Sequence, residues 1–262
     1  MTEAERVITA LRNGHEVLTD LVTPLDGADL TRGSGASEWT VADVLSHLGS
    51  GAEISLAVLA AGVESRPAPS QDDNKAIWAR WDAMTPAEQA AGFLRSNAAL
   101  VDRFESLLPD EDGLLIDVGY LPFPLTLGQY ARLRLSELTL HGWDVRVAFD
   151  DAAALPADAA AALLNGEPNF IAWQAKTDTL GGEHGVVRIT TSDPDSIFGL
   201  HLNDKAEVRL DDAPDATSTL ELPAEAWLRL VAGRLAPART PADVISTGPL
   251  SLDRLRLVFP GF

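Results

Sequence analysis

The first half of the chain places its apolar residues at helical spacing. Between residues 3 and 22 they recur every three or four positions, as at Val7, Leu11 and Leu18, with polar residues between them. This period is typical of an amphipathic helix whose apolar side faces a core. The pattern therefore predicts a helix over residues 3–22 that ends before Pro24.

The same period returns in several later segments. Thr40, with Asp43 three residues later, is typical of a capped helix start and predicts a helix that continues to Gly62. Further helices are predicted at 72–83, 86–108 and 126–149, with irregular chain over 110–124. The Ala-rich segment 151–164 is interpreted as a short linker and a helix that closes the bundle or leads out of it.

Beyond Gly181 the period changes from helix to strand. Short β-rich runs are separated by Asp, Pro, Gly and Asn, as in a meander of strands. The predicted strands are 186–191, 197–201, 206–210, 217–222 and 244–246, with helices at 223–231 and 251–258. Helices followed by strands indicate an α+β protein of two domains. We expect a helical domain over 1–165 and a smaller α+β domain over 166–262.

The composition of the chain argues against some classes of function. The chain has 262 residues, 46% of them apolar, and its 39 acidic against 20 basic side chains give a net charge of −19. Such a surface repels phosphate and anionic lipid, so we expect neither a nucleic-acid nor a membrane partner. No signal pattern or long apolar run is evident, which predicts a cytoplasmic protein. The sequence does not indicate an oligomeric state.

A possible metal site is the main chemical feature. Glu137 and His141 are four residues apart, so they share one face of a helix. With His47 from another helix they would form a His₂Glu set, which leaves a metal position open for water or substrate. Two plainer interpretations remain open: a surface E-x-x-x-H pair, and a core histidine bonded to a carbonyl. The remaining histidines have no comparable surroundings and are expected to be ordinary surface or core residues: His15, His184 and His201.

Two motifs resemble a known family. The segment W-T-V-A-D-V-L-S-H-L, followed about ninety residues later by E-L-T-L-H-G-W-D-V, resembles the N-terminal domain of mycothiol-dependent maleylpyruvate isomerases. That domain belongs to the DinB-like four-helix-bundle superfamily. The second half, with A-W-L-R-L-V-A-G-R-L and L-D-R-L-R-L-V-F-P-G-F, is similar to the C-terminal domain of the same proteins, which is related to sterol-carrier-protein-2 (SCP2-like) folds.

The resemblance implies roles for particular residues. His47, Glu137 and His141 match the Zn²⁺ ligands of the family, and Asp144 matches a position that would support either a ligand or the helix end.

An arginine from the C-terminal domain also acts in the family. The best match in this sequence is Arg234, for which the resemblance implies a catalytic role. Arg229 is a weaker candidate. The alternative for Arg234 is a cation at a helix C-terminus. Trp39 is expected to be a packing residue.

The implied function is a metal-dependent enzyme with Zn²⁺, or another divalent metal, and mycothiol as cofactors. The chain has no cysteine, so a reacting thiol would come from a small molecule. The activated thiol would serve S-transfer to, or cis–trans isomerisation of, a small maleylpyruvate-like electrophile, with Arg234 pairing a substrate carboxylate. The alternatives are a metal-dependent hydrolase and a non-catalytic small-ligand carrier.

Overall fold

The chain folds into two compact units. In the computed structural model, residues 1–108, 113–164, 166 and 171–261 are described. The units are Met1–Ala153 and Ala154–Phe262. The domain border expected at 165–166 falls at Asn165, which lies outside the described residues.

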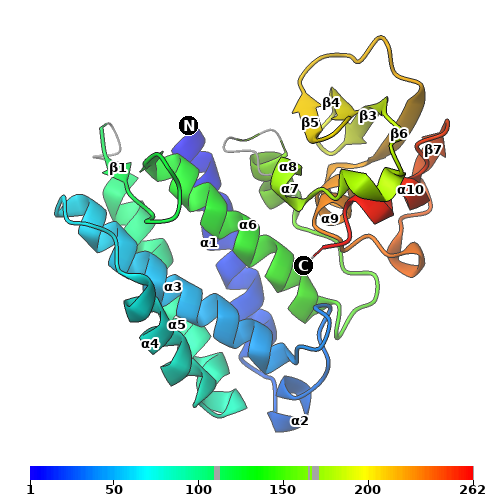
Figure 1. The fold of residues 1–262 in the computed structure, drawn as a ribbon. Coiled ribbons are helices and arrows are strands. Elements are labelled where there is room, and N and C mark those ends of the chain that lie inside the picture. Colours follow the sequence, from blue (N-terminus) through cyan, green and yellow to red (C-terminus); the bar gives the residue numbers. More distant parts are fainter. Residues whose placement is uncertain (109–112, 165, 167–170, 262) are drawn as a thin grey trace. The chain divides into compact units, whose positions relative to one another are not determined.

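Four long helices form the first unit, and they run side by side in Figure 1. They are α1 (Glu3–Val22), α3 (Val41–Val63), α5 (Pro86–Leu107) and α6 (Leu127–Arg146). Each begins at a threonine whose side chain accepts a hydrogen bond from the third helical residue, while that residue's side chain binds back to the threonine N–H. These capping boxes are local signals, and the helices predicted in this part of the chain are confirmed.

Smaller elements complete this unit. They are α2 (Gly27–Leu30), α4 (Gln71–Asp82) and a two-stranded ladder of β1 (Leu115–Ile116) and β2 (Leu125–Thr126). Among the bundle helices, α3 is long and apolar enough to cross a membrane by length and composition. However, 61% of its most apolar stretch is buried inside the structure, as expected for the core helix of a bundle.

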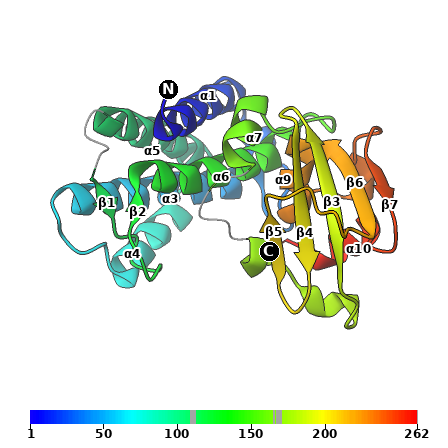
Figure 2. The ribbon, with the colours of Figure 1, turned by 90° about the horizontal axis from the view of Figure 1, so that it is seen from above.

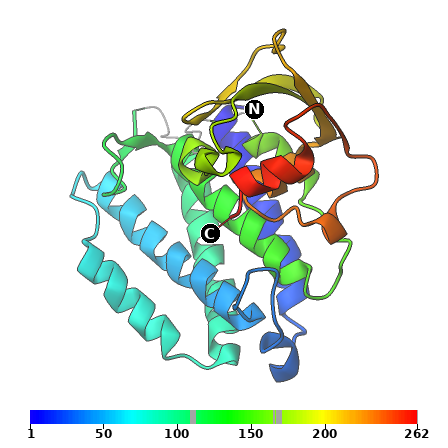
Figure 3. The same cartoon turned by 45° about the vertical axis from the view of Figure 1, so that its right-hand side comes forward.

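Helix α4 lies along α3 at the edge of the bundle (Figure 3). Trp81, only 2% exposed, fixes it there by entering a slot formed by Gly49 and Gly92. A Cβ atom at Gly49 would lie 2.2 Å from the Trp81 ring, so the slot requires glycine. The indole Nε1 also donates to Glu53 Oε2 at 3.0 Å. Both contacts hold α4 firmly against α3.

The second unit is built on a five-stranded sheet with the order β5-β4-β3-β6-β7. Its strands are β3 (Gly185–Ser192), β4 (Ser196–Leu202), β5 (Ala206–Arg209), β6 (Ser218–Pro223) and β7 (Ile245–Thr247). The expected meander is wrong beyond β5, because β6 pairs in parallel with β3, from Val187 opposite Ser218 to Ser192 opposite Pro223. Strand composition predicts strands but not their neighbours, since those depend on long-range pairing.

Helices cover one face of this sheet. Figure 2 shows α9 (Ala224–Val231) and α10 (Leu252–Val258) together against it. Trp227 packs edge-on against Phe198 and Phe259, and the shared core also contains Ala160 of α7 (Ala157–Leu163). The short α8 (Ile171–Gln174) precedes the sheet. The predicted α+β class, a helical domain followed by a sheet domain, is confirmed.

Candidate metal centre

Two helices of the first unit bring three candidate ligands together. Glu137 and His141 lie one turn apart on α6, and His47 comes from α3. His47 Nε2 is 3.0 Å from Glu137 Oε2, and His141 Nε2 is 3.8 Å from the same oxygen. One donor atom from each residue lies within 4.8 Å of the other two. The structure therefore assembles the whole predicted set, although ninety residues separate His47 from Glu137.

The donor set suits a zinc-like ion. Zinc bonds of about 2 Å to imidazole nitrogen and carboxylate oxygen place neighbouring donors somewhat over 3 Å apart. The separations of 3.0 and 3.8 Å bracket that spacing. Two imidazoles and one carboxylate are also the donors of catalytic zinc sites that keep a position open. These residues fit a divalent metal with room for an exogenous ligand.

Asp144 orients one of the ligands. Its side chain is fully buried, and His141 Nδ1 lies 2.9 Å from its Oδ2, which leaves His141 Nε2 facing Glu137. The loop before α3 packs directly on this residue, because Gly35 N donates to Asp144 O at 2.7 Å. A Cβ atom at Gly35 would lie 3.0 Å from Asp144 Oδ1. The expected support from Asp144 thus has a physical basis in a hydrogen bond that fixes the imidazole ring.

The surroundings keep Glu137 ionised. Burial alone would raise the pKa of its carboxyl, but the hydrogen bond with His47 and the charges of His141 and Arg134 outweigh it and lower the pKa to about 2. Arg134 is itself buried, and its Nη2 donates to Leu48 O at 3.4 Å. The carboxylate is therefore an anionic donor at every physiological pH.

Trp39 covers the two imidazoles. Its ring centroid is 5.3 Å from that of His47 and 5.9 Å from that of His141, and it is nearly parallel to the latter. A bridge between Gly33 and Thr40 closes the loop that holds it. The sequence indicated only a packing role, whereas the structure makes this indole a wall of the site.

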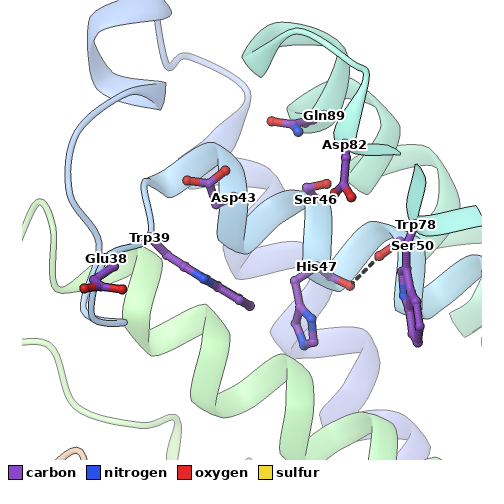
Figure 4. Close-up of a pocket in the computed structure, with 9 residues that line it drawn as sticks. All are labelled: Glu38, Trp39, Asp43, Ser46, His47, Ser50, Trp78, Asp82 and Gln89. Carbon is purple, nitrogen blue, oxygen red and sulfur yellow. Dashed lines mark hydrogen bonds between the residues drawn. The ribbon is translucent and has the colours of Figure 1, made fainter. Parts of the chain in front are cut away.

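A cavity of about 700 Å³ opens beside His47 (Figure 4). It lies among α3, α4, the start of α5 and the loop before α3. Its lining consists of Glu38, Trp39, Asp43, Ser46, His47, Ser50, Trp78, Asp82 and Gln89. The sequence analysis missed this cavity, because the lining residues come from separate segments that no single motif connects.

The two candidate arginines belong to the second unit. Arg229 is buried and forms a bidentate pair with Glu225, both contacts at 2.7 Å, while its Nη1 donates to Arg239 O. Arg234 follows Gly233, whose φ of +71° ends α9, and donates to Ala232 O at 3.0 Å. Arg229 is thus committed to an internal ion pair. The catalytic role of Arg234 stays a prediction.

Comparison with known proteins identifies the family and agrees with the fold. The sequence profile of the mycothiol maleylpyruvate isomerase N-terminal domain matches residues 11–146, which include all three candidate ligands. Among proteins with curated functions, no relative matches the chain.

Two solved structures share the fold over both units. The crystal structure of the mycothiol-dependent maleylpyruvate isomerase superposes with a TM-score of 0.63 at 14% identity, covering 94% of this chain and 93% of that one. A histidine-to-alanine mutant of that isomerase gives 0.64 at 13% identity with the same coverage. With more than half of its length matched by the family profile, this chain belongs to the mycothiol maleylpyruvate isomerase family.

Proposed function

We propose that this protein is a metal-dependent enzyme that uses mycothiol for S-transfer to, or cis–trans isomerisation of, a small maleylpyruvate-like electrophile. The observation that carries the proposal is the convergence of His47, Glu137 and His141 in a member of this family. We further propose that the protein acts in the cytoplasm on small molecules.

The chain's own residues would prepare the site. His47, Glu137 and His141 would hold the metal, Zn²⁺ being the best match to the donors, and Asp144 would fix the His141 ring. A bound zinc ion would stabilise the thiolate form of a coordinated thiol near neutral pH. Because the chain has no cysteine, that thiol would come from mycothiol.

The isomerisation would consume and release the same thiol. Its sulfur would add to one carbon of the cis double bond while a proton adds to the neighbouring carbon. Rotation about the new single bond, loss of the proton and departure of the sulfur would give the trans product with no net change in atoms. In S-transfer the carbon–sulfur bond would persist. Arg234 is proposed to pair with a carboxylate of the substrate.

Metal analysis of purified protein and of the His47→Ala variant tests this function. We expect about one zinc per chain in the wild type, and loss of both metal and mycothiol-dependent turnover in the variant with helical content retained. His15→Gln is the matched control, because His15 is a buried histidine of the same unit whose Nδ1 pairs with Asn97 at 3.1 Å.

Three results would contradict the proposal. Unchanged ligand binding in His47→Ala would favour a carrier. Metal-dependent turnover without any thiol would favour a hydrolase. Equal turnover with glutathione and with mycothiol would contradict the proposed thiol preference.

A further inference from the structure

Three arginines are buried in the part of the chain that the structure describes, and one of them has no acidic partner. Arg229 pairs with Glu225, and Arg132 pairs with Glu3. Arg134, only 8% exposed, forms no ion pair with a described carboxylate, although the net charge of the chain is −19. A cation is costly to bury in this way, and an anion from outside the chain would satisfy it.

The guanidinium of Arg134 also has hydrogen-bond donors to spare. Its Nε is buried without a partner, and its one hydrogen bond to a described residue runs from Nη2 to Leu48 O at 3.4 Å, which is long for such a bond. Buried donors are rarely left unpaired in proteins unless water or a ligand satisfies them. A planar guanidinium matches a carboxylate, which accepts two of its N–H bonds at once.

Arg134 lies beside the metal centre. It precedes Glu137 by three residues on α6, and its Nη1 faces Gly51 of α3, which follows His47 by one turn on the same face. A Cβ atom at Gly51 would lie 2.9 Å from Nη1, so the missing side chain leaves room for the guanidinium. One helical turn is about 5 Å long. A carboxylate on Arg134 would therefore be next to an atom held at the metal.

The cavity beside His47 has the opposite charge. Its lining includes the carboxylates of Glu38, Asp43 and Asp82, and neither lysine nor arginine is among its described lining residues (Figure 4). An electrophile with a carboxylate group would be repelled from the cavity and attracted to Arg134. The charges around the metal centre therefore favour one orientation of such a molecule.

We propose that Arg134 binds a carboxylate group of the electrophile and so directs its double bond to the metal centre. This inference rests on the proposed function, because it assumes that the electrophile reacts at the ligand cluster. Arg134 belongs to the same compact unit as the metal ligands, so its role is separate from that of Arg234 in the second unit. The arginine would hold the carboxylate while the sulfur adds to the neighbouring double bond, and it would neither give nor take a proton.

Turnover of a charged and an uncharged electrophile tests this role. Maleate carries two carboxylates, whereas dimethyl maleate has the same double bond without the charges. With mycothiol as the thiol, Arg134→Met should raise KM for maleate by about 10- to 100-fold, and KM for dimethyl maleate by less than about threefold. Arg134→Lys keeps the charge but not the planar group, so its KM for maleate should be intermediate.

The matched control is Arg132→Met. Arg132 is equally buried on the same helix, but it pairs with Glu3, so this variant should change neither KM. Gly51→Ala gives the same test without removing a buried side chain, because the new Cβ displaces the guanidinium. It should raise KM for maleate and leave KM for dimethyl maleate unchanged. Zinc content should equal that of the wild type in every variant.

Calorimetric titration with maleate needs neither thiol nor turnover. Arg134→Met should weaken maleate binding by about 10- to 100-fold. Equal losses with both electrophiles would overturn the proposal and assign Arg134 a structural role near Glu137. No maleate binding by the wild type, or unchanged binding in Arg134→Met, would also overturn it. A wild type that binds maleate through Arg134 but turns over neither electrophile would refute only the proposed function.

Discussion

The two units of this protein use partly buried carboxylates in opposite ways. In the sheet unit, Glu225 faces the guanidinium of Arg229, which satisfies both of its oxygens. In the helical unit, one oxygen of Glu137 faces two imidazole nitrogens, His47 Nε2 and His141 Nε2. An arginine permanently neutralises a carboxylate, whereas an imidazole can release its proton and offer a lone pair to a cation that the carboxylate also binds. The first arrangement stabilises a fold, and the second provides a ligand site.

A similar contrast exists between two histidines of the helical unit. His15 is buried, its Nδ1 pairs with Asn97, and its ring packs against Phe93. His47 is partly exposed and lines a cavity. Burial of a histidine is therefore not evidence of function by itself. The useful evidence is a set of donor atoms from two helices that lie close enough together to share one cation.

Breaking the Arg229–Glu225 pair should have the largest effect. Arg229→Ala leaves the partly buried carboxylate of Glu225 without its charged partner, so we expect the free energy of unfolding to fall by about 3 kcal/mol. Urea denaturation followed by circular dichroism measures this loss. Zinc content, measured well below the melting temperature, should stay at the wild-type value. Loss of zinc from the folded variant would show that the Arg229–Glu225 pair and the metal ligands are not independent of each other.

Asp144→Asn should weaken metal binding without removing it. The amide retains the shape of the side chain but not its charge, so the His141 ring is held less firmly and zinc affinity should fall by about 10- to 100-fold. Competition with a chromogenic chelator measures the affinity. The control is the free energy of unfolding of the metal-free variant, compared with that of the metal-free wild type. An unchanged zinc affinity would contradict the supporting role of Asp144.

The smallest effect concerns the pH dependence of stability. Burial, followed by the charge of Arg12, lowers the pKa of His15 below its usual value near 6.5. As the pH falls below that value, the unfolded chain binds the proton first, so stability should decline until the lowered folded-state pKa is passed. His15→Gln should remove this part of the decline. Urea titrations of both proteins between about pH 8 and pH 5 would reveal it, and parallel curves would contradict it.

Much of the fold could be predicted because its signals are local. Thr40 and Asp43 form the predicted capping box and start the helix that carries His47. The spacing of Glu137 and His141 placed both on one helix face. The β-rich runs indicated the strands, but the parallel pairing of β3 with β6 was missed because residues far apart in the chain decide it.

The sequence by itself determined the helices, the strands and the types of residue available as ligands, because caps and periodicity act over a few residues. Only the tertiary structure decided that His47 meets Glu137, that Trp39 covers both imidazoles, and that Trp78 shares a cavity with His47 and Trp39. These contacts arise from the packing of α3 against its neighbours. Packing depends on the fit of whole surfaces, which no short stretch of sequence contains.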